Sequence, residues 1–133
     1  MRHLVSAMLF VVGVIHLLPL SGVLSGERLA TLYGLSFAES NISILMRHRA
    51  VLFGLLGLFL LVAAFRRPFQ LAALIAGFVS VVSFLWIAWS VGGYNAQVAR
   101  VVTADIVALV CLVIGAAAYA YLQIRVQRRP EER

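Results

Sequence analysis

Charged residues are scarce in this sequence, and none of the basic ones is lysine. Asp, Glu, Lys and Arg make up 12% of the 133 residues, whereas 63% are hydrophobic and the mean hydropathy is +1.02. A soluble domain has about a quarter of its residues charged and about half apolar. The composition therefore excludes an ordinary soluble domain and indicates a chain that lies largely in a membrane.

Cysteine and acidic residues are also rare. A single cysteine, Cys111, excludes a disulfide within the chain and a cysteine-rich metal site. Only Asp105 among the five acids falls inside a long apolar run, which excludes a di-iron site built from several glutamates. The sequence also contains no Gly-rich phosphate-binding motif, no H-E-x-x-H zinc motif and no nucleophile elbow. We therefore predict no metal site, and no catalytic residue can be named.

The basic residues raise the question of nucleic acid. Eleven arginines against five acids give a net charge of +6. These arginines are scattered among apolar runs and at the C-terminus, with no soluble domain to present them as one surface. Nucleic acid is therefore excluded as a partner, and the arginines are better explained by membrane topology.

Four apolar runs are long enough to cross a bilayer, which takes roughly 20 residues. They extend over residues 4–20, 44–65, 69–91 and 101–122. The first is expected to be a span and not a signal peptide, because three more spans follow and no clear cleavage site is present. The short links "RRP" and "GGYNAQ" force neighbouring spans to run antiparallel. We predict an all-α polytopic membrane protein, an antiparallel four-transmembrane-helix bundle forming one domain over residues 1–133.

The arginines also predict the orientation of the bundle. They precede the first run, separate the second from the third, and form a basic tail over residues 123–133: Arg2, Arg66, Arg67, Arg125, Arg128, Arg129 and Arg133. Basic residues concentrate on the cytoplasmic side of membrane proteins. Both termini are therefore predicted to be cytoplasmic, in the inner membrane if the source is bacterial.

The loop after the first run contains a further helix signal. In "SGERLATLYGLS", Ser25 is suited to an N-cap and Gly34 to a C-cap. A short interfacial helix in the first external loop is expected.

Polar residues from all four spans converge on the outer half of the bilayer. A rise of about 1.5 Å per residue places the "RHR" cluster near the outer edge and His16 roughly 10 Å below the outer surface. Together they predict one polar, ligand-binding pocket: His16, Arg47, His48, Arg49, Trp86, Tyr94, Asn95, Arg100 and Asp105. The plainer alternative is that each side chain reaches independently for interfacial water.

Asp105 needs a partner if it lies in the hydrocarbon, where an unpaired charge costs roughly 2.5 to 3.5 kcal/mol. Arg100 is poorly placed, because five residues turn a helix through about 140°. Arg47 and Arg49 lie about 200° apart on their helix, so one can pair inward while the other reaches the interface. Alignment with Gly54 slightly favours Arg47, and the choice between the two stays open.

Arginine side chains suit phosphate or carboxylate head groups, and Trp86 and Trp89 would line an apolar slot beside them. Membrane lipids are therefore the expected partners, and a lipid- or quinone-like head group the expected ligand, for a binding or accessory protein more than for an enzyme. No cofactor is expected. A quinone- or haem-linked redox subunit, with His16 and His48 as haem ligands, is the alternative. A purely structural or assembly protein is the third possibility.

Small residues at close spacing suit a homo-oligomer or a larger complex as well as packing within one chain.

The chain resembles the small four-span bacterial membrane proteins of the DoxX-like type. The resemblance rests on its length, the His16 end of the first span, the arginine-led "MRHRAVLFGLLG" and the compact last two spans. It implies a pocket role for Arg47 or Arg49 and, for some members, a membrane subunit of a sulfur-compound:quinone oxidoreductase. Similar chains also carry the label phosphopantetheine adenylyltransferase. That enzyme has a T-x-G-H motif in a soluble α/β domain, and the sequence predicts neither.

Overall fold

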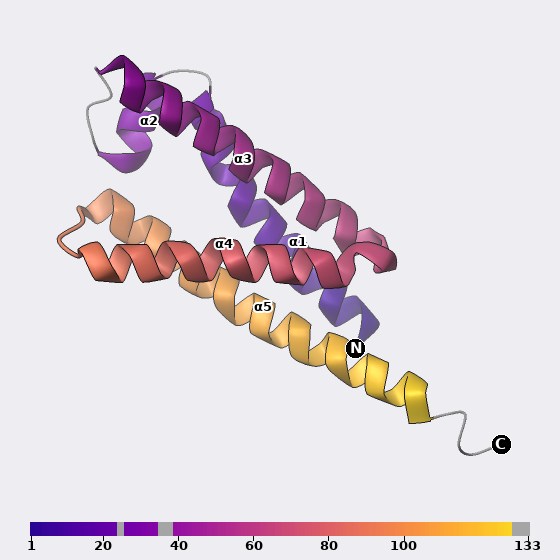
Figure 1. The fold of residues 1–133 in the computed structure, drawn as a ribbon. Coiled ribbons are helices and arrows are strands. Elements are labelled where there is room, and N and C mark those ends of the chain that lie inside the picture. Colours follow the sequence, from indigo (N-terminus) through magenta and orange to yellow (C-terminus); the bar gives the residue numbers. More distant parts are fainter. Residues whose placement is uncertain (24–25, 35–38, 129–133) are drawn as a thin grey trace.

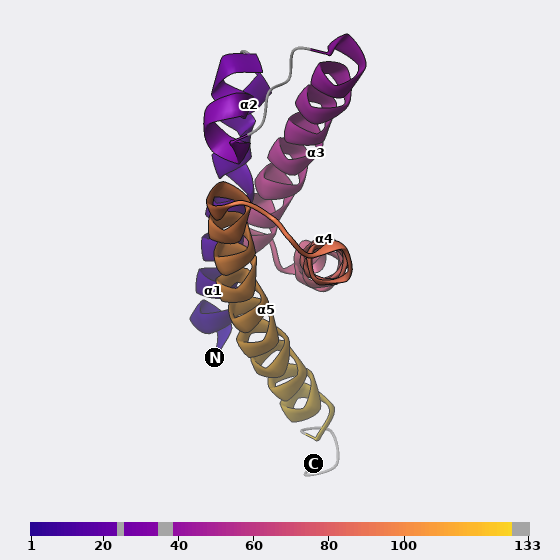
Figure 2. The same ribbon diagram turned by 90° about the vertical axis from the view of Figure 1, so that its left-hand side faces the viewer.

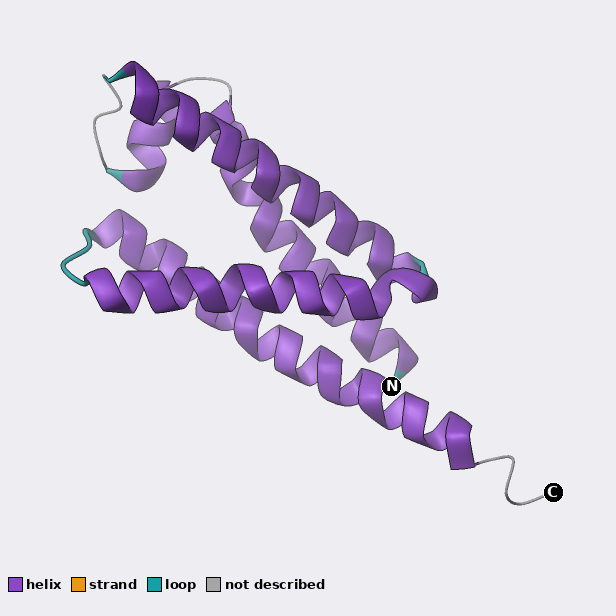
Figure 3. Cartoon of the chain, viewed as in Figure 1, coloured by secondary structure: helices purple, strands orange, loops and turns teal. Residues whose placement is uncertain are grey.

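The computed structural model describes residues 1–23, 26–34 and 39–128, and this part of the chain is helical, with no strand (Figure 3). Its elements follow one another as α1 (Arg2–Leu17), η1 (Leu18–Val23), α2 (Gly26–Tyr33), α3 (Ser40–Phe65), η2 (Arg67–Phe69), α4 (Gln70–Val91) and α5 (Ala96–Arg128). Four stretches are long and apolar enough to cross a membrane: His3–Ser21, Ser40–Phe65, Arg67–Val91 and Ala96–Gln127. The predicted all-α, four-span membrane bundle is confirmed.

The four long helices run alternately up and down, so the bundle has two distinct ends (Figure 1). The terminal end holds the start of α1, the α3–α4 link at η2 and the last turns of α5. The loop end holds η1, α2, the start of α3 and the α4–α5 link. Helix α1 packs between α3 and α5, and α4 packs on α5 and α3. Helices α3 and α4 meet at η2 and diverge toward the loop end (Figures 1 and 2).

Two of the four long helices, α3 and α5, are longer than the apolar runs that predicted them. Helix α3 begins at Ser40 instead of Ile44, and α5 extends from Ala96 to Arg128. Polar residues at both ends continue the helix beyond the hydrocarbon, where apolar pattern no longer marks its limits. The predicted loop helix is α2, which Gly34 ends with a positive φ of 64°. The predicted cap Ser25 and tail residues 129–133 lie outside the described residues.

A close helix contact joins α1 to α3 at Gly13 and Gly57. A Cβ on Gly57 would lie 2.9 Å from the carbonyl oxygen of Gly13, closer than such atoms approach. Only residues without a side chain permit this approach of two backbones. Fully buried side chains lie on the terminal-end side of this contact: Leu9, Val12 and Leu60. Close packing of α1 on α3 therefore lies between the two ends of the bundle.

Polar side chains are almost excluded from the interior. Among the described residues, the buried polar ones are His16, Gln70 and Asp105. His16 and Asp105 lie at the loop end, and Gln70 at the terminal end. A polar group buried in such a bundle destabilises it unless it is hydrogen-bonded or paired, so these three residues mark places to look for function.

Candidate functional site

A cavity of about 380 Å³ lies at the loop end, lined by η1, α2 and the neighbouring ends of α1, α3 and α5. We call it the loop-end cavity. Its polar lining consists of His16, Thr31, Tyr33, Arg49, Gln97, Arg100 and Asp105, and its apolar lining includes Phe53 and Pro19. Four of the nine predicted pocket residues therefore line one cavity, and they come from three different helices.

His16 anchors the wall of this cavity between α1 and α4. Its side chain is 2% exposed, with Nδ1 2.9 Å from the Val12 carbonyl oxygen and Nε2 3.3 Å from the Ser80 hydroxyl oxygen. A carbonyl only accepts, so Nδ1 carries a hydrogen and donates it. In the neutral imidazole Nε2 then accepts from the Ser80 hydroxyl. The Phe53 ring lies against the imidazole, with 5.7 Å between ring centroids.

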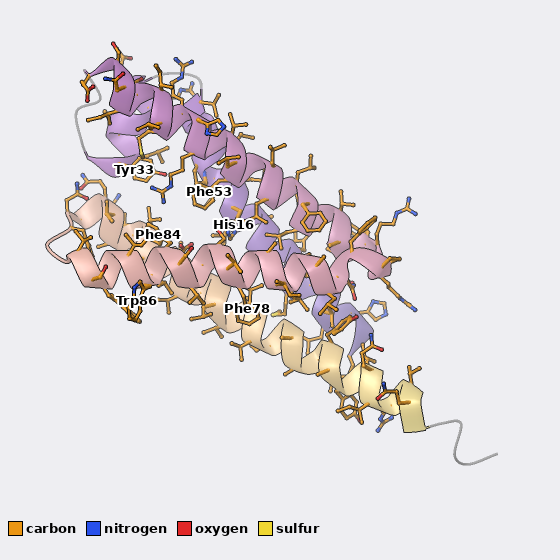
Figure 4. All side chains as sticks on the ribbon, viewed as in Figure 1. His16, Tyr33, Phe53, Phe78, Phe84 and Trp86 are labelled. Carbon is orange, nitrogen blue, oxygen red and sulfur yellow. The ribbon has the colours of Figure 1, made fainter. Side chains whose placement is uncertain are left out.

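Arg49 extends its guanidinium into a cage of aromatic rings. The guanidinium carbon lies 5.1 Å from the Phe53 ring centroid, 5.4 Å from that of Phe84 and 6.0 Å from that of Tyr33. These rings come from α3, α4 and α2, and Figure 4 shows Phe53, Phe84 and His16 facing the same space between helices. Cation–π attraction operates over such distances and holds the charge inside the bundle. The side chain of Arg49 is half-buried.

Asp105 supplies the opposite charge. It is 6% exposed and lies on the face of α5 that lines the cavity, together with Gln97 and Arg100. The positive charge of Arg49 attracts its carboxylate across the cavity. Of the two arginines considered as its partner, Arg49 lines the same cavity as Asp105 and Arg47 does not.

Tyr33 closes the cavity from α2, outside the spanning helices. Burial raises the pKa of Tyr33 above its ordinary value; the charge of Asp105 adds to this effect and that of Arg49 opposes it. The phenol therefore stays protonated at neutral pH and can donate a hydrogen bond. Both charges act on the same hydroxyl, which supports treating the three residues as one cluster.

A second cavity, of about 390 Å³, opens between α3 and α4 beside the first. We call it the side slot. Its lining is mainly apolar: Leu52, Phe53, Leu56, Phe84 and Ile87, with Arg49, Ser80 and Ser83. Arg49 and Phe53 line both cavities, and the His16–Ser80 hydrogen bond joins a residue of one to a residue of the other. A polar chamber and an apolar slot therefore share a wall.

Three predicted pocket residues on α3 and α4 lie elsewhere. Arg47 donates from Nε to the Val23 carbonyl oxygen at 3.0 Å and so ties η1 to α3. His48 is exposed and does not line the loop-end cavity. Trp86 is 72% exposed, and Figure 4 shows it pointing away from the cavities. An indole at this position suits the membrane interface, where Trp is enriched.

The two predicted pocket residues of the α4–α5 link, Tyr94 and Asn95, do not line the cavity. Tyr94 is exposed and lies outside the cavity lining. Asn95 caps α5, because its Oδ1 accepts from the Val98 N–H at 2.9 Å. Its Nδ2 donates to the Tyr33 carbonyl oxygen at 2.7 Å, which docks the end of α2 on the start of α5. Asn95 thus positions Tyr33 without lining the cavity itself.

Several cavity residues were missed by the sequence analysis: Tyr33, Ser80, Phe53, Phe84 and Gln97. Phe53 could have been found, since it lies four residues after Arg49 and so on the same helical face. The other four are brought in by packing between distant helices. Within the described ranges, no three His, Cys, Asp or Glu side chains are grouped to hold a metal ion.

Comparison of the chain with protein-family models, with curated proteins and with solved structures finds no match. The DoxX-like resemblance therefore stays a prediction.

Proposed function

We propose that this membrane protein binds an amphiphilic, lipid- or quinone-like molecule of the bilayer. Its polar head would occupy the loop-end cavity and its apolar part the side slot. The observation that carries the proposal is that Arg49 and Phe53 line both spaces. A ligand that is polar at one end and apolar at the other matches this arrangement, whereas a wholly polar ligand would leave the slot unused.

The cavity suits a head group rich in acceptor oxygens. Arg49 and Arg100 offer N–H donors and positive charge, which favour carboxylate, phosphate or carbonyl oxygens. The Tyr33 phenol adds a neutral donor. Asp105 accepts from a hydroxyl on the same head group and keeps the Arg49 charge directed into the cavity. One acid among several donors favours binding over acid–base chemistry, so a binding or accessory role fits better than catalysis.

The side slot supplies the route by which such a ligand enters. It opens between α3 and α4, the two helices that diverge toward the loop end, and its rim carries exposed Leu52 and Ile87. Apolar side chains there face lipid, so an acyl or isoprenoid chain can enter sideways without crossing water. We do not extend the proposal to haem. His48 lies outside the cavity, and both ring nitrogens of His16 already have partners.

We also propose that the terminal end faces the cytoplasm. The resemblance to bacterial DoxX-like proteins favours the inner membrane as the location. Arg66 and Arg67 at the α3–α4 link and Arg125 near the end of α5 lie at this end, and basic residues concentrate on the cytoplasmic side of membrane proteins. The loop-end cavity then lies in the outer leaflet. A reporter fused after Arg133 is expected to be active in the cytoplasm, and activity outside the membrane would reverse the assignment.

Native mass spectrometry of the protein extracted with its bilayer lipids tests the ligand. Arg49→Gln removes the charge shared by both cavities, and Arg66→Gln is the matched control, since it removes an exposed arginine that lines neither cavity. We expect bound amphiphile to fall about tenfold for Arg49→Gln, because a hydrogen bond to a charged group contributes about 1.5 to 3 kcal/mol, and to change little for Arg66→Gln. Equal retention by both variants would refute the proposal.

A further inference from the structure

A third cavity, of about 500 Å³, lies at the terminal end, between the start of α1, the end of α3, the start of α4 and the last turns of α5. We call it the terminal-end cavity. Its polar lining is formed by His3, Ser6, Arg67, Gln70, Tyr119 and Gln123. It shares no residue with the loop-end cavity or the side slot, and the closely packed Gly13–Gly57 contact lies between them. It is therefore a separate site.

The lining is rich in hydrogen-bond donors. Gln70 is 6% exposed although it carries a polar amide. The Gln123 amide nitrogen donates to the Tyr119 hydroxyl oxygen at 2.8 Å, which leaves the phenolic hydrogen for another acceptor. Arg67 adds a permanent positive charge. Among the described residues that line this cavity none is acidic, so nothing there neutralises that charge.

From this donor set we propose that the terminal-end cavity binds the phosphate group of an anionic lipid. Arginine and amide donors around an anion form charge-assisted hydrogen bonds. Basic sites between helices at a membrane surface recognise anionic head groups in this way. The lipid is favoured over free phosphate because the same cavity is bordered by Phe65 and Val126, which are 76% and 62% exposed and would lie along an acyl chain.

Adjacent arginines provide a matched pair for the test. Arg67 lines the cavity, whereas Arg66 precedes it, is also exposed and does not line it. Both charges sit at the same membrane surface, so a diffuse attraction to anionic lipid would weaken equally when either is removed. A built site would depend on Arg67 alone. Tyr119→Phe gives a second variant that removes only the phenolic hydroxyl.

The experiment is a lipid titration of detergent-solubilised full-length protein, followed by native mass spectrometry with phosphatidylglycerol and phosphatidylcholine. We expect Arg67→Gln to lower the preference for phosphatidylglycerol about tenfold, Tyr119→Phe about threefold, and Arg66→Gln less than twofold. Equal losses for Arg66→Gln and Arg67→Gln would overturn the proposal. So would displacement of the lipid by an equimolar amount of inorganic phosphate, which would show a site for the free anion.

Discussion

The two ends of this bundle each carry a cavity with arginine and tyrosine, yet they are built differently. At the loop end the arginine is surrounded by aromatic rings and lines the same cavity as a buried acid, so opposite charges attract each other across that cavity. At the terminal end the arginine is exposed and no acid lies among the described lining residues. A charge inside the helices loses its hydration and needs an opposite charge from the protein to offset that cost. A charge at the membrane surface stays hydrated and is available to an anionic ligand.

The largest expected effect comes from the contact that separates the two ends. Gly57→Ala places a Cβ 2.9 Å from the Gly13 carbonyl oxygen, and neither backbone can yield cheaply. We expect the free energy of unfolding, measured by SDS titration in mixed micelles, to fall by about 2 to 3 kcal/mol.

Gly115→Ala is the matched control for that variant, because its nearest neighbours are the Met8 and Leu74 side chains at 3.3 and 3.4 Å. There the better helix propensity of alanine offsets the crowding, and a change of less than about 1 kcal/mol is expected. Equal loss for both glycines would mean that the α1–α3 contact is no tighter than the rest of the bundle.

The next effect tests whether the loop end is a matched pair of charges. Arg49→Leu leaves the buried Asp105 without its attracting charge, so we expect the free energy of unfolding to fall by about 1 to 2 kcal/mol, a modest loss because Arg49 is only half-buried. The double variant Arg49→Leu/Asp105→Leu should recover most of this loss, since it leaves no unpaired charge.

The terminal end supplies the control variant for Arg49→Leu. Arg67→Leu at the terminal end removes an exposed charge with no acid facing it, and unfolding should change by less than about 0.5 kcal/mol. The single variants Arg49→Leu and Asp105→Leu complete the cycle. If the double variant loses as much free energy of unfolding as the two single variants together, or more, Arg49 and Asp105 do not act as a pair.

The smallest effect concerns pH. Since burial raises the pKa of Tyr33, the folded state holds this proton more tightly than the unfolded state. Stability from Tyr33 is therefore fully present below the unfolded pKa of about 10 and is lost as pH rises through the folded value. Thermal unfolding followed from pH 7 to 11 should show a smaller alkaline decline for Tyr33→Phe than for the control Tyr94→Phe, whose side chain is exposed. The same decline for both would show that folding does not raise the pKa of Tyr33.

Much of the fold could be predicted from the sequence, because length and apolarity alone determine which segments can cross a bilayer. The convergence of His16, Arg49, Arg100 and Asp105 was predictable to the same extent, since depth in the membrane follows from residue counting. The choice of Arg49 over Arg47 was not. Alignment with Gly54 pointed to Arg47, but the rotation of α3 depends on where η1 offers its Val23 carbonyl and where α4 offers Phe84.

The terminal-end cavity could not be found in this way. The sequence shows the arginine pair at the α3–α4 link but gives no sign that His3 and Gln123, 120 residues apart, border the same space. Their meeting depends on α1 packing against α5. Trp86 shows the opposite kind of error, because it was predicted to line a pocket and does not. Trp86 lies at the right depth for the pocket, but depth does not determine which way a side chain points, and it faces outward.

The divergence of α3 from α4 has one more consequence, which concerns the shape of the surrounding lipid. The α3–α4 pair, which is narrow at η2 and wide toward the loop end, displaces more lipid in one leaflet than in the other (Figures 1 and 2). Such a wedge bends a soft bilayer toward the leaflet with the smaller footprint. We therefore expect the protein to concentrate where the membrane already curves to match it, as enrichment in narrow tubes pulled from giant vesicles would measure.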